Sequence, residues 1–145
     1  MSNIFDVARP QVQPSNFSKP FWDGTREKKL LMQYCPRSRT YQFYPRPLSI
    51  FAARRDLLWR EVSGHGRLYS YTVARMGPGD FRDHVPYVVA LVELDEGVRI
   101  ISNLVQATLD EIRIGMEVVL VWIPMPDGTN LPLFEPKELK SPTSR

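Results

Sequence analysis

The sequence predicts a mainly β protein with one short helix near its start and a small closed barrel in its second half. After residue 56, about five strand-like segments alternate with turn signals every ~8–12 residues, as in small barrels and sandwiches. The 145 residues include 13 prolines, which divide the chain into short elements and disfavour long helices. Gly64 and Gly66 flank a single residue and allow a sharp bend or bulge, because glycine adopts positive φ readily.

The N-terminal part is expected to hold an arm and then a helix. Residues 1–16 are mostly polar and predict an extended or mobile arm, whose Phe5, Val7 and Val12 could dock on a partner. A helix of about two turns is predicted to begin at Ser18, which can cap it, with Pro20 suited to its first turn. Its apolar contacts would be Phe17, Phe21 and Trp22.

Strand-like segments then follow in order, at 30–34, on either side of the glycine pair within 57–75, and at 86–94, 98–105, 117–123 and 131–134. A long bent first strand and a break before the last two strands favour a five-stranded OB-fold. Strict alternation in that first strand would place Tyr69 and Tyr71 on one face and Leu68 on the other. An ordinary hairpin in another β-domain is the alternative interpretation of the glycine pair.

Four regions are expected along the chain. They are an arm at 1–16, a helix with a small module at 17–57, an OB-fold at 58–136 and a tail at 137–145. No signal-peptide pattern opens the chain, the single cysteine cannot form an internal disulfide, and no apolar run approaches the ~20 residues of a membrane span. These features predict a cytoplasmic protein without a membrane partner.

Charge is distributed unevenly along the chain. Between Arg26 and Arg60 there are nine basic and two acidic residues, so this segment carries +7 and the remainder −4. Such a segment can bind a phosphorylated ligand, a nucleic acid or an acidic partner, or can be a solvated face. Tyr69, Tyr71 and Tyr87 could stack on single-stranded nucleic acid or on a nucleotide-containing cofactor, or could half-bury their rings in the sheet.

Two residue pairs have the spacing of zinc knuckles, namely Cys35 with Ser38 and Ser49 with Ala52. A structural zinc site needs four ligands that are mostly thiolates or imidazoles. Only Cys35 could serve here, so no metal is expected. Cys35 is then a small apolar core residue or a reactive thiol whose pKa is lowered by nearby arginines.

No self-contained catalytic constellation is evident in the sequence. His65 lies between the two glycines and His84 lies in a loop, and each could be an acid, a base or a plain surface residue. A stand-alone enzyme that uses Cys35 or His65 remains a further alternative interpretation, although no complete catalytic set supports it.

Six segments carry a family resemblance. They are PFWDGTREKKLLMQYC (Pro20–Cys35), YPRP (Tyr44–Pro47), WREVSGHGRLYSYTV (Trp59–Val73), VPYVVALVELDEGVRIISNLV (Val85–Val105), IRIGMEVVLVW (Ile112–Trp122) and DGTNLPLFEP (Asp127–Pro136). In this order they resemble the acyl-CoA-associated OB-fold family, long catalogued as a domain of unknown function. The resemblance covers about residues 17–136 and implies an N-terminal helix, a rubredoxin-like zinc ribbon and an OB-fold.

The ribbon is where this chain departs from the family. The family typically has four cysteines where this chain has Cys35, Ser38, Ser49 and Ala52. The implied module is therefore a degenerate zinc ribbon. An apolar cluster would pack it without metal, formed by Tyr41 to Tyr44, Leu48, Ile50 and Phe51.

The resemblance also implies a function within complexes. Members of that family partner thiolase-fold enzymes, as in diacetylphloroglucinol-type acetyltransferase complexes, thiolase assemblies and steroid retro-aldolases, and the partner carries the nucleophilic cysteine. The chain is thus expected to be a non-catalytic accessory or scaffolding subunit of a hetero-oligomer. No tightly bound cofactor is expected, and acyl-CoA is the candidate ligand.

The degenerate ribbon and the helix are expected to contact that partner, while the barrel covers the mouth of its substrate tunnel. The residues expected to face a ligand or partner are Phe21, Trp22, Arg46, Tyr69, Tyr71, Tyr87 and Asn103. A single-stranded nucleic-acid-binding OB-fold protein is the alternative. Nucleic acid is not the expected partner, because the strands from Val85 onward are net acidic.

Overall fold

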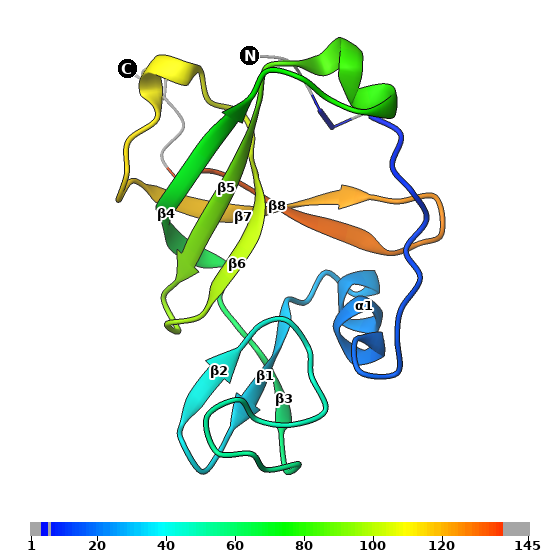
Figure 1. Ribbon diagram of the computed structural model, residues 1–145, viewed down its shortest axis with the longest axis vertical. Helices are drawn as coiled ribbons and strands as arrows, with labels where there is room; N and C mark the ends of the chain where they lie inside the picture. Colours follow the sequence, from blue (N-terminus) through cyan, green and yellow to red (C-terminus); the bar gives the residue numbers. More distant parts are fainter. Residues whose placement is uncertain (1–3, 6, 138–145) are drawn as a thin grey trace.

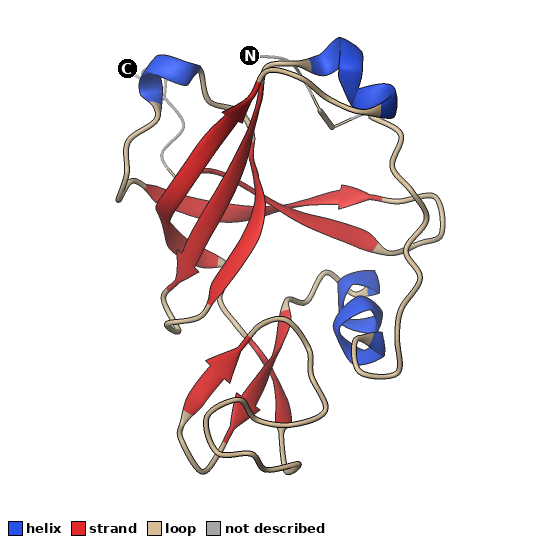
Figure 2. Cartoon of the chain, viewed as in Figure 1, coloured by secondary structure: helices blue, strands red, loops and turns tan. Residues whose placement is uncertain are grey.

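The computed structural model describes residues 4, 5 and 7–137 and has two parts, a closed β-barrel and a small three-stranded sheet with a helix beside it (Figures 1 and 2). The elements, with η for 3-10 helices, are α1 (Lys19–Arg26), β1 (Leu31–Cys35), β2 (Thr40–Gln42), β3 (Leu58–Glu61), β4 (His65–Ala74), η1 (Gly79–His84), β5 (Tyr87–Leu94), β6 (Arg99–Leu104), η2 (Leu109–Glu111), β7 (Glu117–Pro124) and β8 (Asn130–Pro136). The predicted mainly β class with an N-terminal helix is confirmed. Within the described ranges, no helix has the length and apolar character needed to cross a membrane.

The barrel has the strand order β4-β5-β6-β8-β7, and pairing between β4 and β7 closes it. β6 and β8 run parallel and meet at Leu104 and Phe134, whereas the other neighbouring strands are antiparallel. Alternate residues of β5 are buried, as expected for a strand with one face on the barrel interior. The predicted five-stranded OB-fold barrel is confirmed.

Strand β4 changes partner at Gly66, which pairs with Leu94 of β5 and with Val118 of β7. A Cβ atom at this position would overlap the carbonyl oxygen of Glu93 and lie 3.0 Å from the Leu94 Cα. Only glycine therefore allows the strands to approach this closely. Gly64, in the turn before β4, has a positive φ of 78°, a conformation that glycine adopts more readily than other residues.

A β-bulge at Tyr69 changes the alternation of side chains along β4. Leu68 and Ser70 pair with consecutive residues of β5, which leaves Tyr69 as the extra residue. Beyond the bulge, Tyr71 pairs with the buried Ala90 and so returns to the face on which Leu68 is buried. The prediction that Tyr69 and Tyr71 share a face is wrong, because strict alternation fails at a bulge.

Strand β3 pairs with β1 and not with β4. Leu31 of β1 pairs with Glu61, and Gln33 pairs with Trp59, which gives a small sheet of order β2-β1-β3. The alternative interpretation of an ordinary hairpin at the glycine pair is therefore wrong. Strand pairing begins the barrel at His65, and the predicted domain boundaries stay predictions.

One hydrophobic core joins the two parts. It contains Phe21 of α1 and Met32 of β1 together with barrel residues such as Phe134. The fully buried Thr25 of α1 accepts a hydrogen bond from Asn130 N on its Oγ1 at 3.2 Å and one from Asn130 Nδ2 on its carbonyl at 2.8 Å. These bonds fix α1 on the start of β8.

The described part of the arm runs along one side of the molecule to α1 (Figure 1). Ile4 and Val7 are buried in a second cluster, with Val105, Ile123 and Leu133. The Arg9 guanidinium donates to the carbonyls of Ile4 and Val7 at 2.7 and 3.0 Å, and burial lowers its pKa. Val7 thus docks on this chain's own barrel, which offers it an apolar surface. Residues 1–3 and 6 of the predicted arm, and the predicted tail after residue 137, lie outside the described residues.

Candidate functional site

Two turns beside the small sheet, at residues 35–39 and 49–53, have matching backbone geometry. In each turn the fifth residue donates its N–H to the carbonyl of the first, from Arg39 to Cys35 at 2.7 Å and from Ala53 to Ser49 at 2.9 Å. Both fifth residues have positive φ, of 56° and 53°. The N–H of the fourth residue also donates to the side chain of the first, at 3.4 Å to Cys35 Sγ and at 3.1 Å to Ser49 Oγ. The serine hydroxyl thus takes the place in its turn that the cysteine sulfur has in the other.

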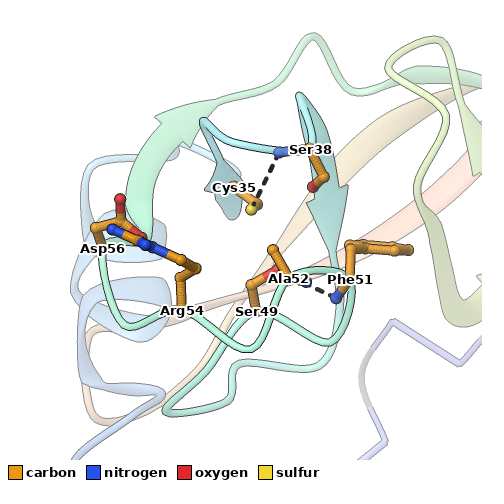
Figure 3. Close-up of polar contacts among 7 residues, drawn as sticks. All are labelled: Cys35, Ser38, Ser49, Phe51, Ala52, Arg54 and Asp56. Carbon is orange, nitrogen blue, oxygen red and sulfur yellow. Dashed lines mark hydrogen bonds and ion pairs between the residues drawn. The ribbon is translucent and has the colours of Figure 1, made fainter.

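Figure 3 shows Cys35, Ser38, Ser49 and Ala52 around one small space, with the ring of Phe51 pointing away from it. Cys35 is buried, and hydrogen bonds from the side chains of Ser38 and Ser49 lower the pKa of its thiol to about 7. These residues do not fit zinc, because they supply one thiolate and two hydroxyls in place of four strong ligands. Within the part of the chain that the structure describes, no cluster of three His, Cys, Asp or Glu side chains is placed to hold a metal.

A pair of buried glutamines fixes the loop between β2 and β3. Gln42 Nε2 donates to Gln33 Oε1 at 2.8 Å across the paired strands. Gln33 also donates to the Arg46 carbonyl at 2.7 Å and accepts the Arg46 N–H at 2.8 Å. Gln42 donates to the Leu48 carbonyl at 3.1 Å and accepts the Ile50 N–H at 2.9 Å. We call these two residues the glutamine clamp, because they bind three points of one loop from inside the module.

The β2–β3 loop, residues 43–57, presents apolar side chains to solvent. Tyr44, Ile50 and Phe51 are 53%, 56% and 53% exposed. The expectation that all of them pack the module from within is wrong, since the glutamine clamp lies beneath the loop. Phe43 packs on the core that the small sheet shares with α1 and the barrel. Arg46, predicted to face a ligand or partner, is exposed in this loop.

The other predicted site residues do not form one site. Phe21 is buried, with its ring 5.0 Å from that of Trp22, and so anchors α1 on this domain. Tyr87 lies 5.1 Å from the Phe81 ring and packs on the arm's cluster. The Asn103 Nδ2 donates to the carbonyl of its neighbouring strand at 2.8 Å.

Tyr69 and Tyr71 are both exposed, on different faces of β4. The guanidinium of Arg99 lies 3.8 Å from the centre of the Tyr69 ring, a cation–π contact on the outside of the barrel. Nucleic-acid-binding barrels stack successive bases on a row of aromatic rings. The bulge interrupts such a row here, so the nucleic-acid alternative loses the feature that motivated it.

The comparisons with known proteins agree with this architecture. The family model described as ChsH2, C-terminal OB-fold domain, matches residues 59–122. A DUF35 domain-containing scaffold protein of Methanocaldococcus jannaschii is 34% identical over 104 residues, which cover 70% of this chain and 73% of that protein. A probable enoyl-CoA hydratase alpha subunit of Thermomonospora curvata is 38% identical over 129 residues, covering 88% of this chain. The match spans only 39% of that longer relative.

One similar solved structure is described as Ltp2-ChsH2(DUF35) aldolase. Its matching chain superposes with a TM-score of 0.77 and 36% sequence identity. The match covers 88% of this chain and 98% of that one. The similarity therefore extends over the helix, the small sheet and the barrel, and is not limited to the barrel.

Proposed function

Because the chain belongs to the DUF35 family of OB-fold scaffold proteins, we propose that it is a non-catalytic accessory subunit of a thiolase-like acyl-transfer complex in the cytoplasm. The observation that carries this proposal is its match to nearly the whole DUF35 chain of an aldolase assembly. The partner subunit would perform the chemistry, as an acyltransferase, a thiolase or a retro-aldolase. This chain would hold the complex together.

The small sheet and its two matched turns constitute, in this proposal, a zinc-ribbon-like module that folds without metal. The matching backbone bonds at Cys35 and Ser49 support this interpretation, because the two turns share one geometry. The side-chain hydrogen bond from Ser49 to Cys35 joins the two turns where a metal would otherwise cross-link them, and the glutamine clamp holds the loop that carries the second turn.

Acyl-CoA is the proposed ligand of the complex, shared between this chain and its partner. Tyr69 and Arg99 lie together on the outside of the barrel, where the Arg99 guanidinium stacks on the Tyr69 ring and also pairs with Glu93 at 3.5 Å, and both side chains stay partly exposed. These groups suit the adenine and the phosphates of coenzyme A. Isothermal titration of the purified complex with an acyl-CoA, with Tyr69→Ala and Arg99→Ala beside wild type, would test this contact.

Co-expression tests the main proposal. The tagged chain would be produced with each thiolase-fold subunit encoded by its source organism, and the eluted proteins would be analysed by light scattering. A stoichiometric hetero-oligomer with one of these subunits is the expected result. A monodisperse monomer that retains none of them would overturn the proposal.

A further inference from the structure

We propose that the β2–β3 loop is a docking surface for a protein partner whose own surface is apolar at its centre and acidic at its rim. This inference rests on the proposed function and specifies where the partner binds. The centre of the surface is formed by Tyr44, Ile50 and Phe51, each more than half exposed. Three large apolar side chains within eight residues of one loop exceed the scattered exposure that is normal for a soluble surface.

The charge on the same module defines the partner's chemistry. Arg37, Arg39, Arg46 and Arg55 are all exposed on the same module. Among the described residues, no carboxylate forms an ion pair with any of these four; Arg54 pairs with Asp56 at 3.5 Å. Exposed arginines beside aromatic and aliphatic side chains are typical of protein interfaces, where guanidinium groups bind carboxylates in pairs of hydrogen bonds. The complementary surface is therefore acidic.

The loop is organised before any partner arrives. The glutamine clamp binds its backbone at Arg46, Leu48 and Ile50, so the exposed side chains project from a fixed frame. A preorganised loop loses little conformational entropy on binding, which raises the affinity that a few side chains can provide. This explains why buried amides underlie a solvent-exposed loop of apolar residues.

A protein fits this surface better than a nucleic acid does. Ile50 offers no π-face for a base, and the barrel beyond the module is net acidic. A phosphate backbone has no apolar surface with which to cover the three exposed side chains, whereas a protein surface can bury them.

Two double variants and two matched controls test the surface. Ile50→Asp with Phe51→Asp removes the apolar centre, and Arg46→Glu with Arg55→Glu reverses the rim. Ile114→Asp, at a residue 62% exposed between η2 and β7, is the apolar control, and Arg75→Glu with Arg82→Glu is the charge control. Each protein would be titrated against the thiolase-fold subunit that wild type retains, at low and at high salt, after circular dichroism has shown an unchanged fold.

The expected result is at least ~30-fold weaker binding for the apolar pair, since the loss of even one central interface anchor costs about 2 kcal/mol, which is ~30-fold. The arginine pair should bind at least ~10-fold more weakly and show a smaller salt dependence, while both controls stay within ~3-fold of wild type. Loop variants that bind like wild type would overturn the docking surface but leave the proposed function standing. If wild type retains no thiolase-fold subunit, both fail. Salt-sensitive retention on single-stranded DNA that the arginine pair abolishes would also overturn a protein partner.

Discussion

Gln42 donates its side-chain amide to Gln33 Oε1 at 2.8 Å, and the two residues then bind the backbone of one loop at three separate positions. Both amides are buried, so each hydrogen bond replaces water that cannot reach them. The small sheet is thereby tied to its longest loop without a metal or a disulfide.

Replacing Gln42 with alanine should lower the free energy of unfolding by about 3 kcal/mol, because the change leaves the buried Gln33 Oε1 short of a donor and the partly buried Ile50 N–H without its acceptor. Urea denaturation followed by tryptophan fluorescence would measure the loss. Gln13→Ala, at an exposed position, is the matched control and should change stability by less than about 0.5 kcal/mol. Equal free energies of unfolding for the two variants would show that the hydrogen bonds of Gln42 do not stabilise the folded protein.

Gly66→Ala should destabilise the barrel by about 3 kcal/mol, since the added methyl group would overlap the Glu93 carbonyl at the point where β4 meets both of its partners. Thermal unfolding of the variant and of wild type would measure the decrease in midpoint temperature. Ser70→Ala, at an exposed position of the same strand, controls for the change of strand residue. A Gly66→Ala protein as stable as wild type would show that β4 and β5 can move apart to accommodate a methyl group without a loss of stability.

The barrel could be predicted from the sequence because its signals are local. Strand-length apolar runs and turn residues place β5, β6 and β7 within a few residues of their observed bounds. The glycine pair predicts a bend or a bulge; Gly66 lies where β4 pairs with both β5 and β7, and the β-bulge is at Tyr69 instead. The resemblance of ordered segments to a known family placed the helix and the small module before the barrel.

Features that depend on contacts between distant residues could not be predicted in this way. A bulge at Tyr69 leaves no mark in the residue pattern, and it moves Tyr71 to the other face. Gln33 and Gln42 look like ordinary polar residues in short strands, and only their pairing across the sheet reveals the clamp. The pairing of β3 with β1 rather than β4 likewise follows from tertiary packing.

The thiol of Cys35 should titrate near pH 7 in the folded protein, because hydrogen bonds from Ser38 and Ser49 stabilise the thiolate. In the unfolded chain a free thiol titrates at about 8.5. Since the folded pKa is the lower one, ionisation favours the folded state; this contribution is complete above about pH 8.5 and is lost as the pH falls through 7.

Ultraviolet absorbance of the thiolate as a function of pH measures this titration, with Cys35→Ser subtracted to remove the tyrosine signal. Ser38→Ala should move the midpoint upward, because it removes the largest cause of the shift. A native midpoint equal to that in urea would contradict the proposed hydrogen bonding.

Three substitutions should install a metal site between the matched turns: Ser38→Cys, Ser49→Cys and Ala52→Cys, beside the native Cys35. The backbone of each turn already directs N–H groups at its first side chain, as the bonds to Cys35 Sγ and Ser49 Oγ show, and four thiolates then satisfy tetrahedral zinc or cobalt. The variant should give the absorption of tetrahedral cobalt thiolate and unfold at higher urea with metal than without it, because metal binding to the folded state adds to its stability. The same three substitutions in a Cys35→Ser background supply one thiolate fewer and should bind cobalt more weakly. A folded variant with four cysteines and no tetrahedral spectrum would show that the two turns do not share the geometry of a metal-binding pair.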